Sequence, residues 1–298
     1  MSTKPARRNA RTLDDEALHA WPLPMPSSDG DKEQRGHVLV VAGSREMPGA
    51  AVLAATAALR AGAGKVAIAS GAAAAQTIAL AVPEARVVAL PETAEGRIHP
   101  DAVAVLAQLK GPFDAMLFGP GMQDEESTCE LVVRALSTLR ATSVILDAIA
   151  MGAIERVTGL LLPMLLTPHA GEMAHLLDIA KDTVNHDPLP IACKAAAHWN
   201  AAVALKGAAT FIALPDGRAW CHEGGNVGLA ISGSGDVLAG IIAGLAARGA
   251  SLEQAAAWGV ALHARAGERL AARFGPIGYL AREISAEVPV LMHTLGSG

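Results

Sequence analysis

A glycine-rich segment that ends in a carboxylate carries the strongest chemical signal in this sequence. It reads Gly233, Ser234, Gly235 and Asp236, at the start of a long apolar run. Glycines at the start of a helix leave backbone N–H groups accessible, and these groups together with the helix dipole bind anions. A carboxylate beside such an anion site can accept a proton from a hydroxyl that attacks phosphorus. The motif alone is also compatible with Asp236 acting as an ordinary helix cap.

Two further segments place charged side chains where strand-like runs end. Lys206 and Gly207 follow one run, and a lysine beside a tight glycine turn can hold a nucleotide at the edge of a sheet. In the segment 165–177, His169 can bind a polar substrate and Glu172 can order Mg²⁺ through water. Taken singly, Lys206 and His169 are equally compatible with ordinary surface positions.

Glycines and one more carboxylate follow other apolar runs. Gly119 and Gly121 allow close approach of the backbone to a ligand. Asp147 ends a further run, and by itself it is compatible with a capping role. The loops that follow parallel strands gather at one edge of a sheet, so a single site built from six such loops is the simplest interpretation.

The elements that must position these residues alternate between strand and helix. Apolar runs at 37–43, 65–70, 85–90, 115–119, 143–147, 164–167 and 202–207 predict strands. Helix-like segments lie at 49–64, 101–110, 125–140, 188–200, 235–249 and 252–274. Near-continuous apolar runs are typical of parallel strands that helices cover on both faces. The segment 210–222 carries Pro-Asp-Gly between two strand-like halves, which predicts a β-hairpin at one edge of the sheet.

These patterns predict one main domain with a short extension. Residues 1–35 are polar and rich in proline, which predicts an irregular lead-in. Residues 36–298 predict a single three-layer α/β/α domain with a mainly parallel open sheet.

Composition argues against several classes of function. The net charge is −5 and there is no basic tract, which argues against nucleic acid binding. The N-terminal segment has no apolar run typical of a secretory signal, and no uncharged stretch predicts a membrane span. The three cysteines are scattered and form no CxxC pair, which favours a reducing cytoplasmic location without structural zinc.

Six segments together resemble the ADP-dependent NAD(P)H-hydrate dehydratases of the ribokinase-like superfamily. The segments are 38–66, 118–122, 144–150, 165–172, 203–217 and 225–245, in the order of that family. The sequence departs from the family pattern at Ser232 and Ser234 of the glycine loop, at Ala170, and at Glu223-Gly224-Gly225, which precedes Asn226. The resemblance implies the ribokinase-like fold.

The resemblance also implies roles for particular residues. Asp236 would be the catalytic carboxylate and Glu172 an indirect ligand of Mg²⁺. The nucleotide would be bound by Lys206, Gly207, Ala208, Ala209, Thr210, Asn226, Gly233, Ser234 and Gly235. The hydrated nicotinamide would be bound by Ala50, Ala51, Gly121, His169 and Asp236.

The implied reaction repairs a damaged cofactor. ADP would drive dehydration of the S epimer of NADHX or NADPHX, the hydrated forms of NADH and NADPH, with release of AMP and phosphate. The resemblance further implies a cytoplasmic homotetramer in the stand-alone form, with a separate NAD(P)H-hydrate epimerase as its partner.

Two alternatives stay open at this point. The segment 167–172 is also similar to the Thr-Pro-Asn-x-x-Glu motif of kinases for hydroxymethylpyrimidine, thiazole or pyridoxal, with His169 in place of Asn. A non-catalytic adenine-nucleotide sensor is the other alternative. Asp236 argues against the sensor, because a pure binder gains nothing from a carboxylate beside phosphates.

Overall fold

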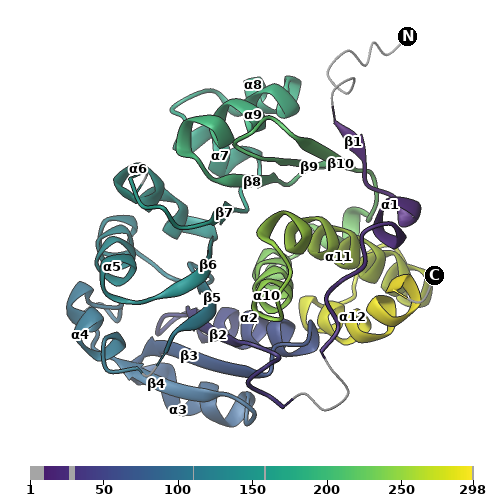
Figure 1. Ribbon diagram of the computed structural model, residues 1–298. Helices are drawn as coiled ribbons and strands as arrows, with labels where there is room; N and C mark the ends of the chain where they lie inside the picture. The colour runs from purple at the N-terminus through teal and green to yellow at the C-terminus, as the bar shows by residue number, and fades with distance from the viewer. Residues whose placement is uncertain (1–9, 27–30, 110, 158, 297–298) are drawn as a thin grey trace.

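One open sheet forms the centre of the computed structural model, which describes residues 10–26, 31–109, 111–157 and 159–296. Within these ranges the sheet has ten strands, in the order β1-β10-β9-β8-β7-β6-β5-β2-β3-β4 (Figure 1). Neighbouring strands run parallel, except that β9 is antiparallel to both β8 and β10. The predicted mainly parallel open sheet is therefore confirmed.

The strands match the predicted apolar runs closely. They are β1 Arg11–Thr12, β2 His37–Val41, β3 Lys65–Gly71, β4 Arg86–Leu90, β5 Phe113–Phe118, β6 Ala141–Leu146, β7 Met164–Leu166, β8 Ala202–Leu205, β9 Thr210–Ala213 and β10 Ala219–His222. The predicted run 202–207 is longer than β8, because Lys206 and Gly207 already belong to the loop that follows the strand.

Helices connect the strands and extend the C-terminal part of the chain. They are α1 Asp15–His19, α2 Pro48–Arg60, α3 Ala72–Ala81, α4 Val103–Leu106, α5 Glu125–Thr138, α6 Ile154–Val157, α7 Ala170–Leu176, α8 Lys181–His186, α9 Pro188–Trp199, α10 Ser234–Ala247, α11 Leu252–Phe274 and α12 Ala281–Gly296. The helix expected at 101–110 is only the single turn α4. None of the described helices combines the length and the apolar composition that crossing a membrane requires.

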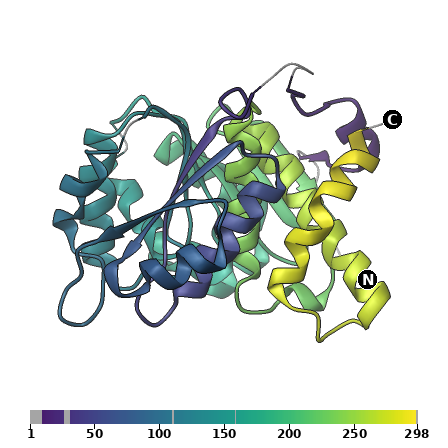
Figure 2. The ribbon, with the colours of Figure 1, turned by 90° about the horizontal axis from the view of Figure 1, so that it is seen from below.

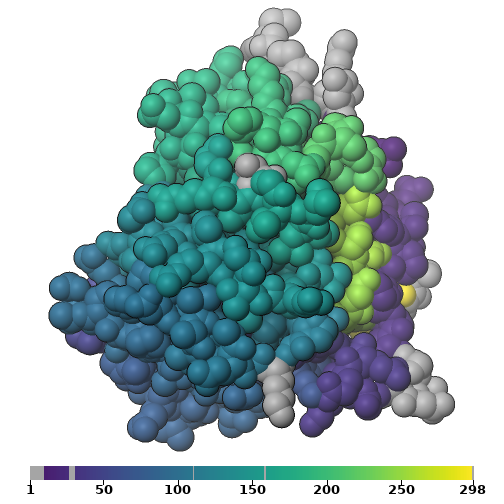
Figure 3. Space-filling view, turned by 60° about the vertical axis from the view of Figure 1, so that its left-hand side comes forward, coloured from purple at the N-terminus to yellow at the C-terminus, as the bar shows by residue number. Residues whose placement is uncertain are grey.

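Two hydrophobic cores lie on opposite faces of the sheet. Alternate residues of a strand point to opposite faces. Accordingly, Val38 and Val40 of β2 belong to the core beneath α2, α3, α10, α11 and α12, whereas Leu39 and Val41 belong to the core beneath α4, α5, α6, α7 and α9. Figure 2 shows α10, α11 and α12 on one side of the sheet, and Figure 3 shows the face formed by the middle of the chain.

The N-terminal segment corrects two expectations. Residues 1–35 were expected to be irregular, but β1 and α1 lie within them; residues 1–9 and 27–30 lie outside the described residues. Strand β1 pairs with β10, so the predicted hairpin of β9 and β10 is present but is not the outermost part of the sheet. A two-residue strand has no periodicity to detect, and its pairing depends on residues about 200 positions away in the sequence.

Helix α10 packs unusually close to α2. A Cβ atom at Gly240 would overlap the carbonyl oxygen of Ala54, and one at Gly244 would overlap the carbonyl oxygen of Ala58. Both obstacles are backbone atoms, which cannot rotate away. Glycine at these two positions therefore allows the two helices to touch backbone to backbone.

We predict that Gly240→Ala destabilises the protein. In the interior of a helix, alanine is ordinarily more favourable than glycine by about 1 kcal/mol. Here the added methyl group must push α10 away from α2, at a cost of about 1–3 kcal/mol beyond that gain. Urea unfolding measures the change. Gly49→Ala, in the first turn of α2 where a Cβ meets no atom within 4 Å, is the matched control and should be neutral or stabilising. Equal effects of the two substitutions would contradict this packing account.

Candidate active site

The sheet reverses its direction of winding between β2 and β5. The chain runs outward from β2 through β3 to β4 on one side, and from β5 through β6 to β7 on the other. Ligands bind at the carboxyl ends of the strands near such a reversal. The loops after β2 and β5 meet there: Gly43 donates to the carbonyl of Pro120 (2.7 Å), and Gly119 donates to the carbonyl of Val41 (3.3 Å).

A cavity of about 820 Å³ lies at the carboxyl ends of the strands and extends towards β10. Its walls come from the loops after β6, β7, β8 and β10 and from α10 and α11. Among the lining residues are Asp147, His169, Glu172, Lys206, Gly207, Ala208, Thr210, His222, Asn226, Gly233, Ser234, Gly235, Asp236 and His263. The structure thus brings together every predicted nucleotide-binding residue except Ala209, together with Asp236, His169 and Glu172.

The N-terminus of α10 opens into this cavity. Gly233 caps the helix with a left-handed backbone (φ +87°), a conformation that glycine adopts without strain. The N–H groups of Ser234 and Val237 donate to the carbonyls of Ile231 and Gly233. The N–H groups of Gly235 and Asp236 donate to no acceptor within the described residues. Two such groups, together with the helix dipole, have the geometry that the predicted anion site requires.

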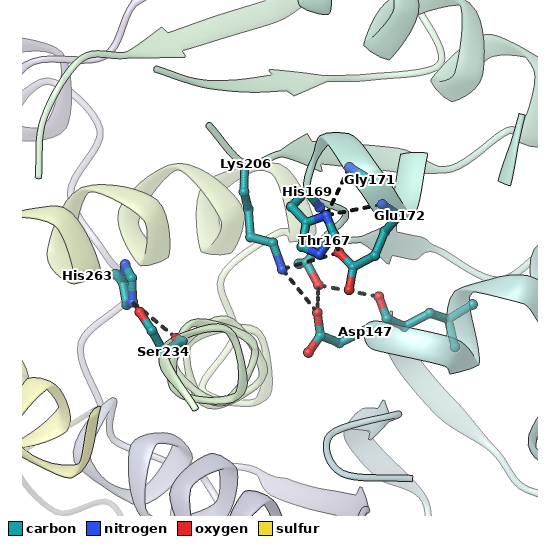
Figure 4. Close-up of polar contacts among 9 residues, drawn as sticks. Asp147, Thr167, His169, Gly171, Glu172, Lys206, Ser234 and His263 are labelled. Atoms are coloured by element: carbon teal, nitrogen blue, oxygen red, sulfur yellow. Dashed lines mark hydrogen bonds and ion pairs between the residues drawn. The ribbon is translucent and has the colours of Figure 1, made fainter. Parts of the chain in front are cut away.

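Lys206 brings a positive charge to the same place. Its Nζ lies 3.5 Å from Oδ1 of Asp147 and 3.8 Å from Oε2 of Glu172 (Figure 4). A Cβ at Gly235 would lie 3.4 Å from this Nζ, so the ammonium group is next to the start of α10. Asp147 is buried, and its Oδ1 also accepts a hydrogen bond from the hydroxyl of Thr167 at 2.6 Å. The ammonium group of Lys206 therefore lies beside the N–H groups at the N-terminus of α10, and both can interact favourably with phosphate.

His169 and Glu172 form a capping box at the start of α7. Nδ1 of His169 accepts from the N–H groups of Gly171 and Glu172, at 3.0 and 3.1 Å, and the His169 N–H donates to Oε2 of Glu172 at 2.7 Å. Because Nδ1 accepts, the neutral ring carries its proton on Nε2. His169 therefore has a structural role, and its Nε2–H is a donor on the cavity wall.

Three of the five residues predicted for the nicotinamide side, Ala50, Ala51 and Gly121, lie outside the cavity, whereas His169 and Asp236 line it. Gly121 and Ala50 are neighbours, since a Cβ at Gly121 would lie 2.5 Å from that of Ala50. Ala50 is half-buried, whereas Ala51 is fully buried and packs towards Gly43. Ala209 packs against the small cluster around Phe211. The predicted binding roles of Ala50, Gly121 and Ala209 remain predictions.

Two histidines of the site escaped the sequence analysis. His263 lies on α11, and its Nε2 is 2.9 Å from Oγ of Ser234 (Figure 4); burial lowers its pKa to about 4. His222 ends β10, with its Nδ1 2.8 Å from the carbonyl oxygen of Leu13. A lone histidine within an apolar segment gives little signal, because its partner lies far away in the sequence.

The surroundings of Asp236 make it a stronger base than an ordinary carboxylate. Burial, and secondarily the negative charge of Asp147, raise the pKa of Asp236 to about 6, and the opposing effect of Lys206 is smaller. A carboxylate with a pKa just below neutral is mostly ionised at pH 7 and accepts a proton readily.

The raised pKa predicts that Asp236→Asn stabilises the protein above pH 6. The folded state favours the protonated acid, so ionisation costs folding free energy as the pH rises through the folded pKa of about 6. Asparagine removes this cost. The free energy of unfolding should rise by up to about 3 kcal/mol at pH 8, and the gain should largely vanish at pH 4. Denaturant unfolding at both pH values tests this, and a gain that persists unchanged at pH 4 would contradict it.

Comparison with known proteins identifies first the fold class and then the family. The structure matches a ribokinase-like superfamily protein of Enterococcus faecalis with a TM-score of 0.80 and 24% identity over all of both chains, so the fold is ribokinase-like. The family model for NAD(P)H-hydrate dehydratase matches residues 38–290, and the chain belongs to this family.

Individual relatives agree with this assignment. The chain is 48% identical to an ADP-dependent (S)-NAD(P)H-hydrate dehydratase of Xanthomonas campestris, over 97% of this chain and 98% of the relative. It is 40% identical to a bifunctional NAD(P)H-hydrate repair enzyme of Moorella thermoacetica, over 92% of this chain but only 52% of the relative. The ADP/ATP-dependent NAD(P)H-hydrate dehydratase of Bacillus subtilis, co-crystallised with ATP and Mg²⁺, superimposes with a TM-score of 0.85 at 30% identity, covering 97% and 99% of the two chains.

Proposed function

We propose that this protein uses ADP to dehydrate the S epimer of NADHX and NADPHX, which restores NADH and NADPH. One observation carries the proposal: a carboxylate whose pKa is raised to about 6 lies at the open start of α10, next to Lys206. That combination suits transfer of a phosphoryl group to a hydroxyl. Family membership and the similarity to named dehydratases support the choice of substrate.

Binding would place the phosphates of ADP at the start of α10. The N–H groups of Gly235 and Asp236 donate to phosphate oxygens, and the ammonium group of Lys206 balances their charge. The loop of Gly207, Ala208, Ala209 and Thr210 would lie along the nucleotide. On the other side, Ala50, Gly121 and the Nε2–H of His169 would bind the hydrated nicotinamide, whereas the predicted contact from Ala51 is wrong because this residue is fully buried.

The chemistry converts a poor leaving group into a good one. Asp236 accepts the proton of the ring hydroxyl, and the hydroxyl oxygen attacks the β-phosphorus of ADP while the bond to the bridging oxygen breaks and AMP leaves. The lone pair of the ring nitrogen then expels the new phosphate. Loss of a proton from the adjacent ring carbon restores the double bond of NADH. The N–H groups of Gly235 and Asp236 stabilise the charge that develops on the phosphoryl oxygens.

The donors near the site suit Mg²⁺ held mainly by phosphates and water. No group of three or more His, Cys, Asp or Glu side chains among the described residues could form an all-protein metal site. Mg²⁺ commonly keeps several waters and binds through substrate phosphates, so few protein ligands are needed. Glu172 and Asp147 are the carboxylates placed to hold its water shell, and the ion would supply neutralisation of phosphate charge.

We also propose the cellular setting that the family resemblance suggests. The protein would act in the cytoplasm as a homotetramer, and a separate epimerase would supply the S epimer. The similarity to a bifunctional NAD(P)H-hydrate repair enzyme, of which this chain covers 52%, supports a partner activity of this kind.

We predict that the protein restores the absorbance of reduced nicotinamide when it is mixed with chemically hydrated NADH, ADP and Mg²⁺. One AMP and one phosphate should appear for each NADH. Hydroxymethylpyrimidine, thiazole and pyridoxal alcohols are the comparison substrates, and their phosphorylation without repair of the hydrate would favour a vitamin kinase instead.

The same assay tests the role of Asp236. Asp236→Asn keeps the size of the side chain and leaves Gly233, the cap of α10, in place. Turnover should fall by about two to four orders of magnitude, the range typical of general acid–base catalysis. Binding of ADP should persist or tighten, because a negative charge near the phosphates is removed. Near-normal turnover would contradict the catalytic role of Asp236.

A further inference from the structure

Two buried polar atoms on the cavity wall have no partner among the described residues. They are Nε2 of His222, whose residue is only 3% exposed, and Nδ2 of Asn226, which caps the short turn Val227–Leu229. Both residues line the 820 Å³ cavity. Buried polar groups are nearly always hydrogen-bonded to protein, water or ligand, so two atoms without a protein partner on one wall are candidates to bind a molecule in the cavity.

The chemical character of the His222 atom is fixed by the N-terminal segment. Nδ1 of His222 lies 2.8 Å from the carbonyl oxygen of Leu13, which can only accept a hydrogen bond, so Nδ1 carries the proton. Burial lowers the pKa of His222 and keeps the ring neutral. Nε2 is therefore a hydrogen-bond acceptor. Strand β1 holds Leu13 in place, since the Leu13 N–H donates to the carbonyl of Cys221.

The orientation of Asn226 is fixed in the same way. Its Oδ1 accepts hydrogen bonds from the N–H of Gly228 at 2.9 Å and from the hydroxyl of Tyr279 at 2.8 Å. Both partners are donors, so the assignment of oxygen and nitrogen in this amide is determined. The remaining Nδ2 group is a donor on the cavity wall.

The backbone of Gly224 lies close to this histidine atom. A Cβ at this position would lie 2.6 Å from Nε2 of His222. Gly224 is also one of the positions at which the sequence departs from the family pattern. His222 supplies the acceptor, and glycine at position 224 avoids a side chain that would collide with it.

The distance from the phosphate site suits the far end of a nucleotide. Strand β10 lies two strands from β8 in the sheet. At a strand spacing of about 4.8 Å, this separation is about 10 Å, roughly the reach from the phosphates of a nucleoside diphosphate to its base. Val260 and Ala264 of α11 provide an apolar wall in the same cavity, which suits the flat face of a base.

We propose that His222 and Asn226 recognise the adenine base of ADP, an inference that rests on the proposed use of ADP. Nε2 of His222 accepts a hydrogen bond from the 6-amino group, and the Asn226 amide donates to a ring nitrogen next to it. A 6-oxo purine presents an acceptor to the His222 acceptor, so hypoxanthine and guanine are disfavoured.

The test compares the binding of ADP and inosine diphosphate by calorimetry. The wild type should prefer ADP by about tenfold or more. His222→Asn places an amide nitrogen where Nδ1 stood, so the bond to Leu13 can persist while the Nε2 acceptor is removed. Loss of one hydrogen bond should weaken ADP binding about 5- to 10-fold, whereas inosine diphosphate should bind equally well or slightly more tightly because the opposing acceptor is removed.

A second variant blocks the same atom in another way, and a control variant makes the same substitution away from the cavity. Gly224→Ala keeps the imidazole but places a methyl group against Nε2, which must displace the ring or the loop, and it should also reduce the preference for ADP. His198→Asn, on the exposed side of α9, makes the same chemical change away from the cavity and should leave both affinities as they are.

Each contrary outcome has a distinct meaning. Equal losses for the two nucleotides, or an unchanged preference, would overturn the role of His222 and leave the proposed function standing. If His222→Asn erases discrimination against 2′-deoxy-ADP and not against inosine diphosphate, the acceptor serves the ribose and the adenine assignment is wrong. If the wild type binds neither ADP nor inosine diphosphate, the inference and the proposed use of ADP fail together.

Discussion

The close packing of α10 on α2 is the constraint on which the rest of the site depends. Gly240 and Gly244 let the two helix backbones touch, and α10 in turn lies against the central strands β5 and β6. This position aims the start of α10 at the carboxyl edge of the sheet, where the loops after β6, β7 and β8 also end. Side chains larger than hydrogen at the contact would shift the anion site relative to Lys206 and Asp147.

The site combines repulsion between two carboxylates with attraction of both to one lysine. Asp236 and Asp147 repel each other, and both face the positive charge of Lys206. The result is a base near neutral pKa beside a cationic site for phosphate. Nucleotide binding would use Lys206 and the N-terminus of α10. Proton transfer would use Asp236, whose ionised form is disfavoured by burial and by the charge of Asp147. The two tasks are carried by neighbouring but different groups.

Local patterns in the sequence predicted much of this architecture. Continuous apolar runs indicated the parallel strands, and the rule that loops gather at one edge brought Asp236, Lys206, His169 and Glu172 into one predicted site, as the structure has them. These predictions succeed because the strand order and the helix start follow from short-range pattern and from topology.

Features that depend on distant partners could not be predicted in this way. The bond between His222 and Leu13 joins residues 209 positions apart, and β1 is too short to show a period. The capping box of His169 and Glu172 is visible in the sequence only as a spacing of three residues. The sequence therefore suggested binding roles for both residues, and their structural role became evident only in the structure. Ala51 carries no polar group, and nothing local distinguished its buried position from the half-buried position of Ala50.

The fate of the hydroxyl oxygen tests the central claim most directly. Hydrated NADH prepared in ¹⁸O-water carries the label in the ring hydroxyl, and the labelled substrate can be turned over with ADP and Mg²⁺ in ordinary water. If that oxygen attacks phosphorus and leaves as phosphate, mass spectrometry should find one ¹⁸O in the inorganic phosphate for each NADH formed. Label recovered in water, with unlabelled phosphate, would contradict phosphoryl transfer to the hydrate.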